Sequence, residues 1–214
     1  MHEYLKIETV FNRDVNGTKK LITGDWRDDT VEYLSDLDWI WTEKIDGTNI
    51  GVVWDGHKVS FQGRTEKADI PKHLKAKLEE LFSTNEAEEL FEQLFGEKEV
   101  ILFGEGYGHK IQAVGDLYKS EGPDFILFDI YMPTNDLYLK RDAVESIAKS
   151  FGIDVVPVIG VGPLINAITY VKTKPQSTIG TAPMEGLVCR PFIELRNREG
   201  NRVIVKIKVK DFVY

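Results

Sequence analysis

The seven residues E-K-I-D-G-T-N at positions 43–49 are the stretch from which both the fold and the chemistry of this chain can be worked out. They join two apolar runs, 39–41 and 50–54, that are rich in the aromatic and β-branched residues typical of strands. Lys44 therefore stands at the end of a strand. Lysine is a nucleophile only when its amine is neutral, and the free side chain has a pKa of about 10.4. Desolvation or neighbouring cations can lower that pKa, so a reactive Lys44 needs such an environment from the rest of the chain.

Outward from this stretch, the pattern predicts strands mixed with helices. Asp55-Gly56 is a hairpin signal, and helical spacing of apolar residues covers 71–95, broken near 83–85 where polar residues offer a new N-cap. Residues 104–108 are rich in glycine and are expected to form a loop. Strands are expected at 39–43, 49–54, 57–61, 100–103, 125–128, 153–158, 186–190, 193–196 and 202–209. Further helices are expected at 140–151 and after Pro163, and a loop at 174–183.

The order of these elements indicates the fold class. Strands and helices are mixed without a regular β-α-β repeat, which favours an α+β fold with antiparallel sheets flanked by helices. No linker or repeat divides the chain, so residues 1–214 are expected to form a single domain.

The composition excludes several classes of protein. With 42% hydrophobic and 29% charged residues the chain is an ordinary globular sequence. One cysteine, Cys189, excludes an internal disulfide framework and fits a reducing, cytoplasmic location. There is no signal-peptide pattern and no apolar run of membrane-spanning length. The net charge of −8 argues against a chain that binds polyanions over its whole surface. Basic residues nevertheless cluster near the C-terminus, at Arg196, Arg198, Arg202, Lys206, Lys208 and Lys210.

Charged residues recur at the ends of the expected strands. In K-I-K at 206–208, strand alternation places both lysines on one face and the apolar residues on the other. A sheet face that carries two cations suits a polyphosphate. The residues of this kind are Lys44 with Asp46, Arg64, Glu105, Glu185, and Lys206 with Lys208.

This ordered set resembles the motifs of the covalent nucleotidyltransferases, which are ATP-dependent DNA ligases, RNA ligases and mRNA capping enzymes. The stretch at 43–49 is similar to their K-x-D-G signature, and Arg64 falls where the next motif carries an arginine. The later motifs of the family are similar to four further stretches of this chain: F-G-E at 103–105, F-D at 128–129, E-G at 185–186 and K-I-K at 206–208. The forms G-E-G-Y-G-x-K-I-Q at 104–112 and K-I-K-x-K-D-F at 206–212 look most like RNA ligases of the phage RNA ligase 2 type.

The resemblance implies a nucleotidyltransferase adenylation fold and a chemistry. Lys44 would attack the α-phosphate of ATP to give a lysyl-AMP intermediate, AMP would pass to an RNA 5′-phosphate, and a 3′-hydroxyl would then seal the strand. Lys206 and Lys208 would hold the α-phosphate and disfavour protonation of Lys44. Glu185 would help bind Mg²⁺ or Mn²⁺, through water.

The resemblance also implies how ATP is bound and which partners the protein has. Glu105 would accept from a ribose hydroxyl, and Phe128 would stack on adenine. Glu43 would either read the adenine amino edge or orient the loop, and Arg64 and Asn49 would contact phosphate or the acceptor strand end. Asp46 would belong to the same nucleotide site. Expected partners are RNA ends or a nicked duplex, with no membrane, in the host cytoplasm if the chain is phage-encoded.

Several alternatives stay open at this point. From the residues alone, Lys44 and Asp46 also fit a turn with a surface ion pair, Phe128 fits a core position, and the lysine pair fits a solvated strand face. A DNA ligase, a capping guanylyltransferase, or a nucleotide-binding module without ligation are the competing functions. Many family members add a domain after the lysine pair, whereas this sequence stops six residues after Lys208. An appended OB-fold or helical domain is therefore expected to be absent.

Overall fold

A computed structural model describes residues 2–65 and 68–213 and divides the chain into two compact units. Unit 1 comprises Met1–Leu5 with Asp46–Val156, and unit 2 comprises Lys6–Ile45 with Pro157–Tyr214. The antiparallel sheets flanked by helices confirm the predicted α+β class. The single domain without a C-terminal extension stays a prediction. In the ranges that the structure describes, no helix is long and apolar enough to cross a membrane.

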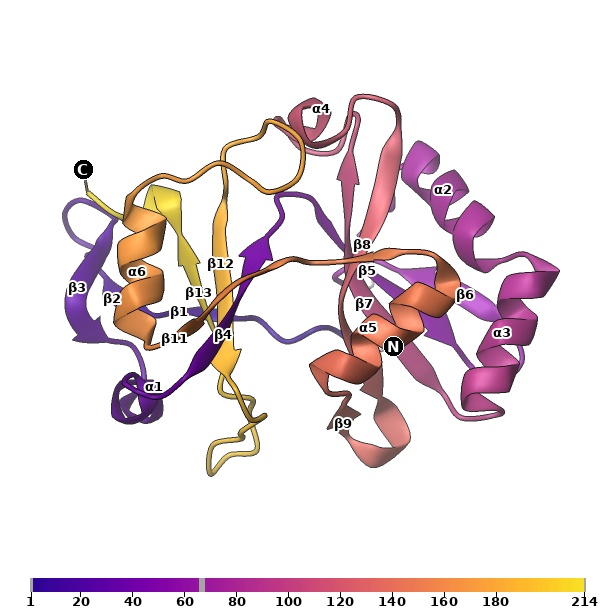
Figure 1. Cartoon of the computed structure of the whole chain (residues 1–214), viewed down its shortest axis with the longest axis horizontal. Helices are drawn as coiled ribbons and strands as arrows, with labels where there is room; N and C mark the ends of the chain where they lie inside the picture. Colours follow the sequence, from indigo (N-terminus) through magenta and orange to yellow (C-terminus); the bar gives the residue numbers. More distant parts are fainter. Residues whose placement is uncertain (1, 66–67, 214) are drawn as a thin grey trace. The chain divides into compact units, whose positions relative to one another are not determined.

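Unit 2 is built on a sheet in which β12 lies between β4 and β13 and runs antiparallel to both. Figure 1 shows α6 (Leu164–Lys172) against one face of this sheet. Apolar side chains of α6, among them Ile168, pack there on Trp39, Leu187 and Ile207 to form the core of the unit. The strands, in sheet order, are β1 (Glu8–Thr9), β13 (Val205–Lys208), β12 (Gly186–Pro191), β4 (Trp39–Lys44) and β11 (Val158–Gly162).

Alternation along β4 decides where Lys44 points. Trp39, Trp41 and Glu43 are buried on the α6 side, whereas Thr42 and Lys44 are partly exposed on the other face. The same alternation in β13 buries Val205 and Ile207 and leaves Lys206 and Lys208 partly exposed, as predicted. Lys44 and the lysine pair therefore share the face of the sheet that α6 does not cover.

The rest of unit 2 lies outside this sheet. A hairpin of β2 (Phe11–Arg13) and β3 (Leu21–Trp26) precedes α1 (Asp29–Leu34). The side chain of Asp28 caps α1 by accepting from the amides of Thr30 and Val31. A short 3₁₀ turn, η2 (Val209–Asp211), follows β13.

The strand predicted at 193–196 is wrong, and the one predicted at 202–209 starts only at Val205. Residues 192–204 form a connection that folds back on itself, where Arg202 Nε lies 2.5 Å from Glu194 Oε1. Ile193, the first residue of the predicted strand, is 71% exposed. The apolar pattern was misleading because, in the described residues, this stretch pairs only through an isolated bridge between Arg196 and Arg202.

Unit 1 is built on a second sheet, with the order β10-β8-β7-β5-β6 and with β9 added on β8. Its helices α2, α3 and α5 lie on one side of the sheet (Figure 1), and their apolar side chains form the core with the strands. The strands are β5 (Thr48–Trp54), β6 (Val59–Gln62), β7 (Val100–Gly108), β8 (Pro123–Met132), β9 (Leu137–Tyr138) and β10 (Asp154–Val155). The helices are α2 (Lys72–Phe82), α3 (Asn85–Phe95), α4 (Gly115–Tyr118), η1 (Pro133–Asn135) and α5 (Arg141–Phe151).

The predicted break in the helical stretch 71–95 is confirmed, because Thr84 caps α3 by accepting from the amide of Ala87. The glycine-rich loop predicted at 104–108 is wrong, since these residues continue strand β7. A Cβ at Gly104 would lie 2.3 Å from the ring of Phe125, and one at Gly106 would lie 2.4 Å from Leu74. These glycines therefore permit close approach of neighbouring groups to a strand rather than a turn.

The strand predicted at 153–158 is divided in two. Residues Asp154–Val155 form β10 in unit 1, and β11 begins at Val158 in unit 2. Pro157 lies between the two and has no amide hydrogen for a ladder bond. The predicted helix after Pro163 is confirmed as α6.

Candidate active site

Three of the predicted site residues meet at one end of the sheet in unit 2. The Nζ of Lys44 lies 2.5 Å from Oε2 of Glu185, and the Nζ of Lys208 lies 3.0 Å from Oε1 of the same carboxylate. Gly186 explains the convergence, because it is the register partner of Lys44 on β4 and of Lys208 on β13. The three side chains are 13 to 26% exposed, so this ion-paired cluster is largely shielded from water.

The carboxylate of Glu185 sets the electrostatics of the cluster. Burial alone would lower the pKa of Lys208, but the charge and hydrogen bond of Glu185 outweigh it, with smaller contributions from Lys210 and Asp211, and the pKa is raised above its ordinary value of 10.5. The sequence predicted two cations facing Lys44. The structure adds an anion between the ammonium groups of Lys44 and Lys208.

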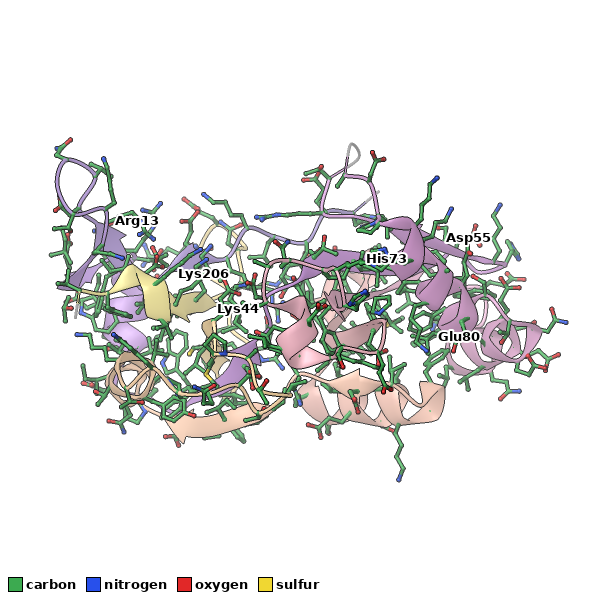
Figure 2. The ribbon with its side chains drawn as sticks, turned by 90° about the horizontal axis from the view of Figure 1, so that it is seen from above. Arg13, Lys44, Asp55, His73, Glu80 and Lys206 are labelled. Carbon is green, nitrogen blue, oxygen red and sulfur yellow. The ribbon has the colours of Figure 1, made fainter. Side chains whose placement is uncertain are left out.

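Lys206 lies further from this cluster on the same face of the sheet. Its register partner on β12 is Val188, whose partner on β4 is Thr42. Figure 2 shows Lys44 and Lys206 on these two strands, which flank β12. The open face of unit 2 thus carries a row of cations that leads away from the end of β4.

We expect Gly186→Ala to destabilise unit 2 at the point where this cluster forms. A Cβ at this position would lie 2.0 Å from the carbonyl oxygen of Ile207, so β12 and β13 would have to separate. The expected loss is about 1–3 kcal/mol of unfolding free energy in chemical denaturation. Gly200→Ala is the control, because nothing lies within 4 Å of its Cβ and only its φ of +82° is strained. An equal or smaller loss in Gly186→Ala would contradict the packing argument.

Glu43, the residue before Lys44, points to the opposite face and is only 1% exposed. Its Oε1 accepts from Ser177 Oγ at 2.5 Å. Its Oε2 accepts from Thr178 N at 3.0 Å and from Thr178 Oγ1 at 2.5 Å. Sequence reasoning missed Ser177 and Thr178. The sequence did contain a sign of them. Glu43 lies on the same side of the strand as Trp39 and Trp41, so it is buried there, and a buried carboxylate requires hydrogen-bond donors.

Asp46, Asn49 and Glu105 belong to unit 1, where the segment that begins at Asp46 runs beside β7. Asn49 and Glu105 are register partners on β5 and β7. A Cβ at Gly47 would lie 2.3 Å from the oxygen of Gly106 and 2.8 Å from Cγ of Glu105, which explains the glycine of the K-x-D-G pattern. The amide of Asp46 donates to Tyr118 Oη at 3.3 Å.

Gln112 also holds this segment, by donating from Nε2 to the carbonyl oxygen of Gly47 at 3.0 Å. The side chain leaves a backbone with φ of +57°, and Lys110 has φ of +59°. Two non-glycine residues in the left-handed region are uncommon and mark a constrained turn. The match of 104–112 to the family therefore reflects, in part, a turn that anchors the backbone after Lys44.

Phe128 lies at a β-bulge. Phe103 on β7 pairs with Asp129 and Gly104 pairs with Leu127, so the register passes over Phe128. Bulges are frequent beside functional sites because they change the direction of a side chain. The ring of Phe128 is half-buried and meets the ring of Tyr4 edge-on, with 5.0 Å between centroids. Phe128 is therefore not a fully buried core residue, and its ring is partly accessible at the bulge.

Tyr4 is another residue that sequence reasoning missed, because residues 1–26 show only irregular or short-strand character. Its hydroxyl donates to Asp129 Oδ2 at 2.5 Å, and Asp129 is 3% exposed. We expect Tyr4→Phe to lower the unfolding free energy by about 1–3 kcal/mol, because a buried carboxylate loses a donor. Tyr131→Phe is the matched control, since its hydroxyl binds Asp136 at an exposed position. Equal losses in chemical denaturation would contradict this role.

Arg64 lies exposed two residues after the end of β6 in unit 1. For the metal, the described residues contain no group of three or more His, Cys, Asp or Glu side chains that could hold an ion. Glu185 could supply one carboxylate. Mg²⁺ commonly takes only one or two protein carboxylates and completes its shell with water and phosphate oxygens, so this chemistry fits.

The chain shares its fold with solved RNA ligases. A lysine-to-alanine variant of Naegleria gruberi RNA ligase with ATP and Mn matches with a TM-score of 0.65 and 20% identity, over 97% of this chain and 63% of that one. The same ligase with pyrophosphate matches with a TM-score of 0.64 and 20% identity, over 96% and 61%. The chain thus spans less than two thirds of the length of these proteins.

The family follows from the sequence itself. The model of the RNA ligase family matches residues 37–208, which is most of the chain and includes every motif from Lys44 to Lys208. The chain therefore belongs to the RNA ligase family. No curated protein matches it.

Proposed function

We propose that this protein is an ATP-dependent RNA ligase that reacts through Lys44. The single observation that carries the proposal is the cluster of Lys44, Glu185 and Lys208 in a chain of the RNA ligase family. A surface ion pair in a turn would leave Lys44 in water. Here the lysine is three-quarters covered, on the same open face as a second and a third cation.

In the proposed first step, the neutral amine of Lys44 attacks the α-phosphorus of ATP. A phosphorus–nitrogen bond forms, the bond from the α-phosphorus to the oxygen that bridges to the β-phosphate breaks, pyrophosphate leaves, and the nitrogen gives one proton to water. Lys206 and Lys208 neutralise charge on the phosphate. Glu185 helps to hold a divalent cation, Mg²⁺ or Mn²⁺, which when bound would neutralise further phosphate charge.

In the proposed later steps, an RNA 5′-phosphate oxygen attacks the same phosphorus and frees Lys44. A 3′-hydroxyl then attacks the 5′-phosphorus and AMP leaves, which seals an RNA end or a nick in a duplex. The other residues have binding roles in this proposal. Phe128 stacks on adenine, Glu105 accepts from a ribose hydroxyl, and Asp46, Asn49 and Arg64 contact the nucleotide or the strand end. The reaction takes place in the cytoplasm.

A pulse-chase experiment tests the proposal. Protein is incubated with α-labelled ATP and Mg²⁺, freed of nucleotide, and given 5′-phosphorylated RNA or DNA ends with a 3′-hydroxyl. We expect acid-precipitable label on the protein that moves to RNA and is released as AMP on sealing. Label that moves only to DNA would indicate a DNA ligase, and labelling by GTP instead of ATP would indicate a capping-type enzyme. Absence of any label would leave only a nucleotide-binding module.

A further inference from the structure

The segment 173–185 connects α6 to β12, and Glu43 on β4 binds it at Ser177 and Thr178. Both oxygens of Glu43 are engaged, by the hydroxyls of Ser177 and Thr178 and by one amide. Hydrogen bonds to a carboxylate are roughly twice as strong as neutral ones, and a buried carboxylate holds its donors firmly because water does not compete.

The two legs of this segment are braced against each other. Ser177 N donates to Ala182 O at 2.9 Å, and Met184 N donates to Pro175 O at 3.0 Å. Ala182 and Met184 are buried, at 0 and 2% exposure. A constraint on Ser177 is thereby passed to Met184, the residue that precedes Glu185.

Glu185 directly follows Met184 and is bound by side chains on the face of the sheet opposite Glu43. Its carboxylate meets Lys44 and Lys208, and its carbonyl oxygen accepts from Val209 N at 2.9 Å. Glu43 and Lys44 are consecutive on β4 and point to opposite faces. Strand β4 therefore binds the segment 173–185 at two points, through Glu43 on the core face and through Lys44 on the open face.

We infer that Glu43 is a positioning residue, and that Glu43, Ser177 and Thr178 form a clasp that sets the carboxylate of Glu185 against Lys44. Glu43 acts through the segment that it binds rather than by reading adenine, because both of its oxygens already accept from Ser177 and Thr178 on the buried face of the sheet. This inference rests on the proposed reaction of Lys44.

The test removes the two hydroxyl donors of the clasp and leaves the residues of β4 unchanged. In Ser177→Ala/Thr178→Val both hydroxyls are lost while Glu43 and Lys44 are unchanged. We expect the rate constant of protein–AMP formation at saturating ATP to fall roughly 10- to 100-fold, because Glu185 is displaced. The KM for ATP should change by less than about 3-fold, since positioning of a reacting group differs from uniform binding. Each rate is divided by the fraction of protein that carries label when the reaction is complete, so that inactive protein does not count.

Glu43→Gln should likewise slow adduct formation with little change in the KM for ATP. Thr178→Ser alone keeps the hydroxyl and should react at the wild-type rate. Thr169→Ala is the matched control, because it removes a hydroxyl that bonds to Ile165 O at 2.8 Å on an exposed part of α6. If Glu43→Gln instead raises the KM for ATP and weakens selection against GTP, while Ser177→Ala/Thr178→Val leaves both unchanged, Glu43 reads the base and the inference is overturned.

Hydrogen exchange separates the clasp from the proposed reaction, because it needs no ATP. The amide of Ile179 donates to Ser177 Oγ at 2.9 Å. In Ser177→Ala/Thr178→Val the amides of Ile179 and Met184 should exchange at least about 10-fold faster than in the wild type. Unchanged exchange at Met184 would overturn the clasp even if the wild type forms the adduct. Faster exchange in a protein whose wild type forms no adduct would support the clasp and refute the proposed chemistry.

Discussion

Lys44→Ala is expected to abolish the protein–AMP adduct, with a loss of at least about 10³-fold in labelling by α-labelled ATP. The covalent bond requires an amine at the end of β4, and no other described lysine occupies that position. The fold should survive, because Lys44 is 26% exposed and Glu185 keeps Lys208 as its partner. Circular dichroism and thermal unfolding of the variant provide that check.

Lys44→Arg is the sharper companion variant. A guanidinium keeps the positive charge beside Glu185 but is not deprotonated in proteins, so it cannot act as a nucleophile. We expect a melting temperature close to that of the wild type together with no adduct. An adduct in either variant would show that another residue is the nucleophile, and peptide mapping of the label would identify it.

Glu185→Gln is expected to have the second largest effect, on both stability and reaction. The carboxylate is the shared anion of Lys44 and Lys208, and the three side chains are largely covered. Removing one partner of a covered ion pair leaves charges without compensation, which costs more than the intact pair contributes. We expect a fall in melting temperature of roughly 3–10 °C and a loss of adduct formation of about 100-fold.

A second substitution tests the cause of that loss. Lys208→Met in the Glu185→Gln background removes one of the two uncompensated cations and should recover part of the melting temperature without restoring the reaction. The coupling between the two positions is measured by a double-mutant cycle. Additive effects on the melting temperature would show that Glu185 and Lys208 do not interact, which would contradict the ion pair in the structure.

The local part of this site could be predicted because strand alternation depends only on neighbours in the sequence. W-I-W-T-E-K at 39–44 places Lys44 opposite the tryptophans, and V-K-I-K at 205–208 places both lysines together. The same local rules predicted a second helix with its N-cap within 83–85, where Thr84 caps α3. They failed at 104–108, where glycines serve contacts with Phe125 and Leu74 that are remote in sequence.

Partners that lie far apart along the chain could not be predicted from such rules. The resemblance named Glu185 as a metal ligand, whereas the structure also makes it the shared ion-pair partner of Lys44 and Lys208. The donors to Glu43 come from a segment whose sequence indicated only a loop. The hydroxyl of Tyr4 reaches an aspartate 125 residues away. In each case the side chain's polarity showed that a partner was needed, but the identity of the partner depends on which segments become neighbours.

The sequence by itself determined the family, the order of the motifs and the shared strand face of Lys206 and Lys208. It did so because motif spacing and strand alternation are properties of contiguous residues. Only the tertiary structure decided that Lys44 and Lys208 share Glu185 and that Glu43 is bound by Ser177 and Thr178. Lys44 and Glu185 are 141 positions apart and meet because β12 pairs with both β4 and β13. That pairing is set by burial of the core beneath the sheet, to which the whole unit contributes.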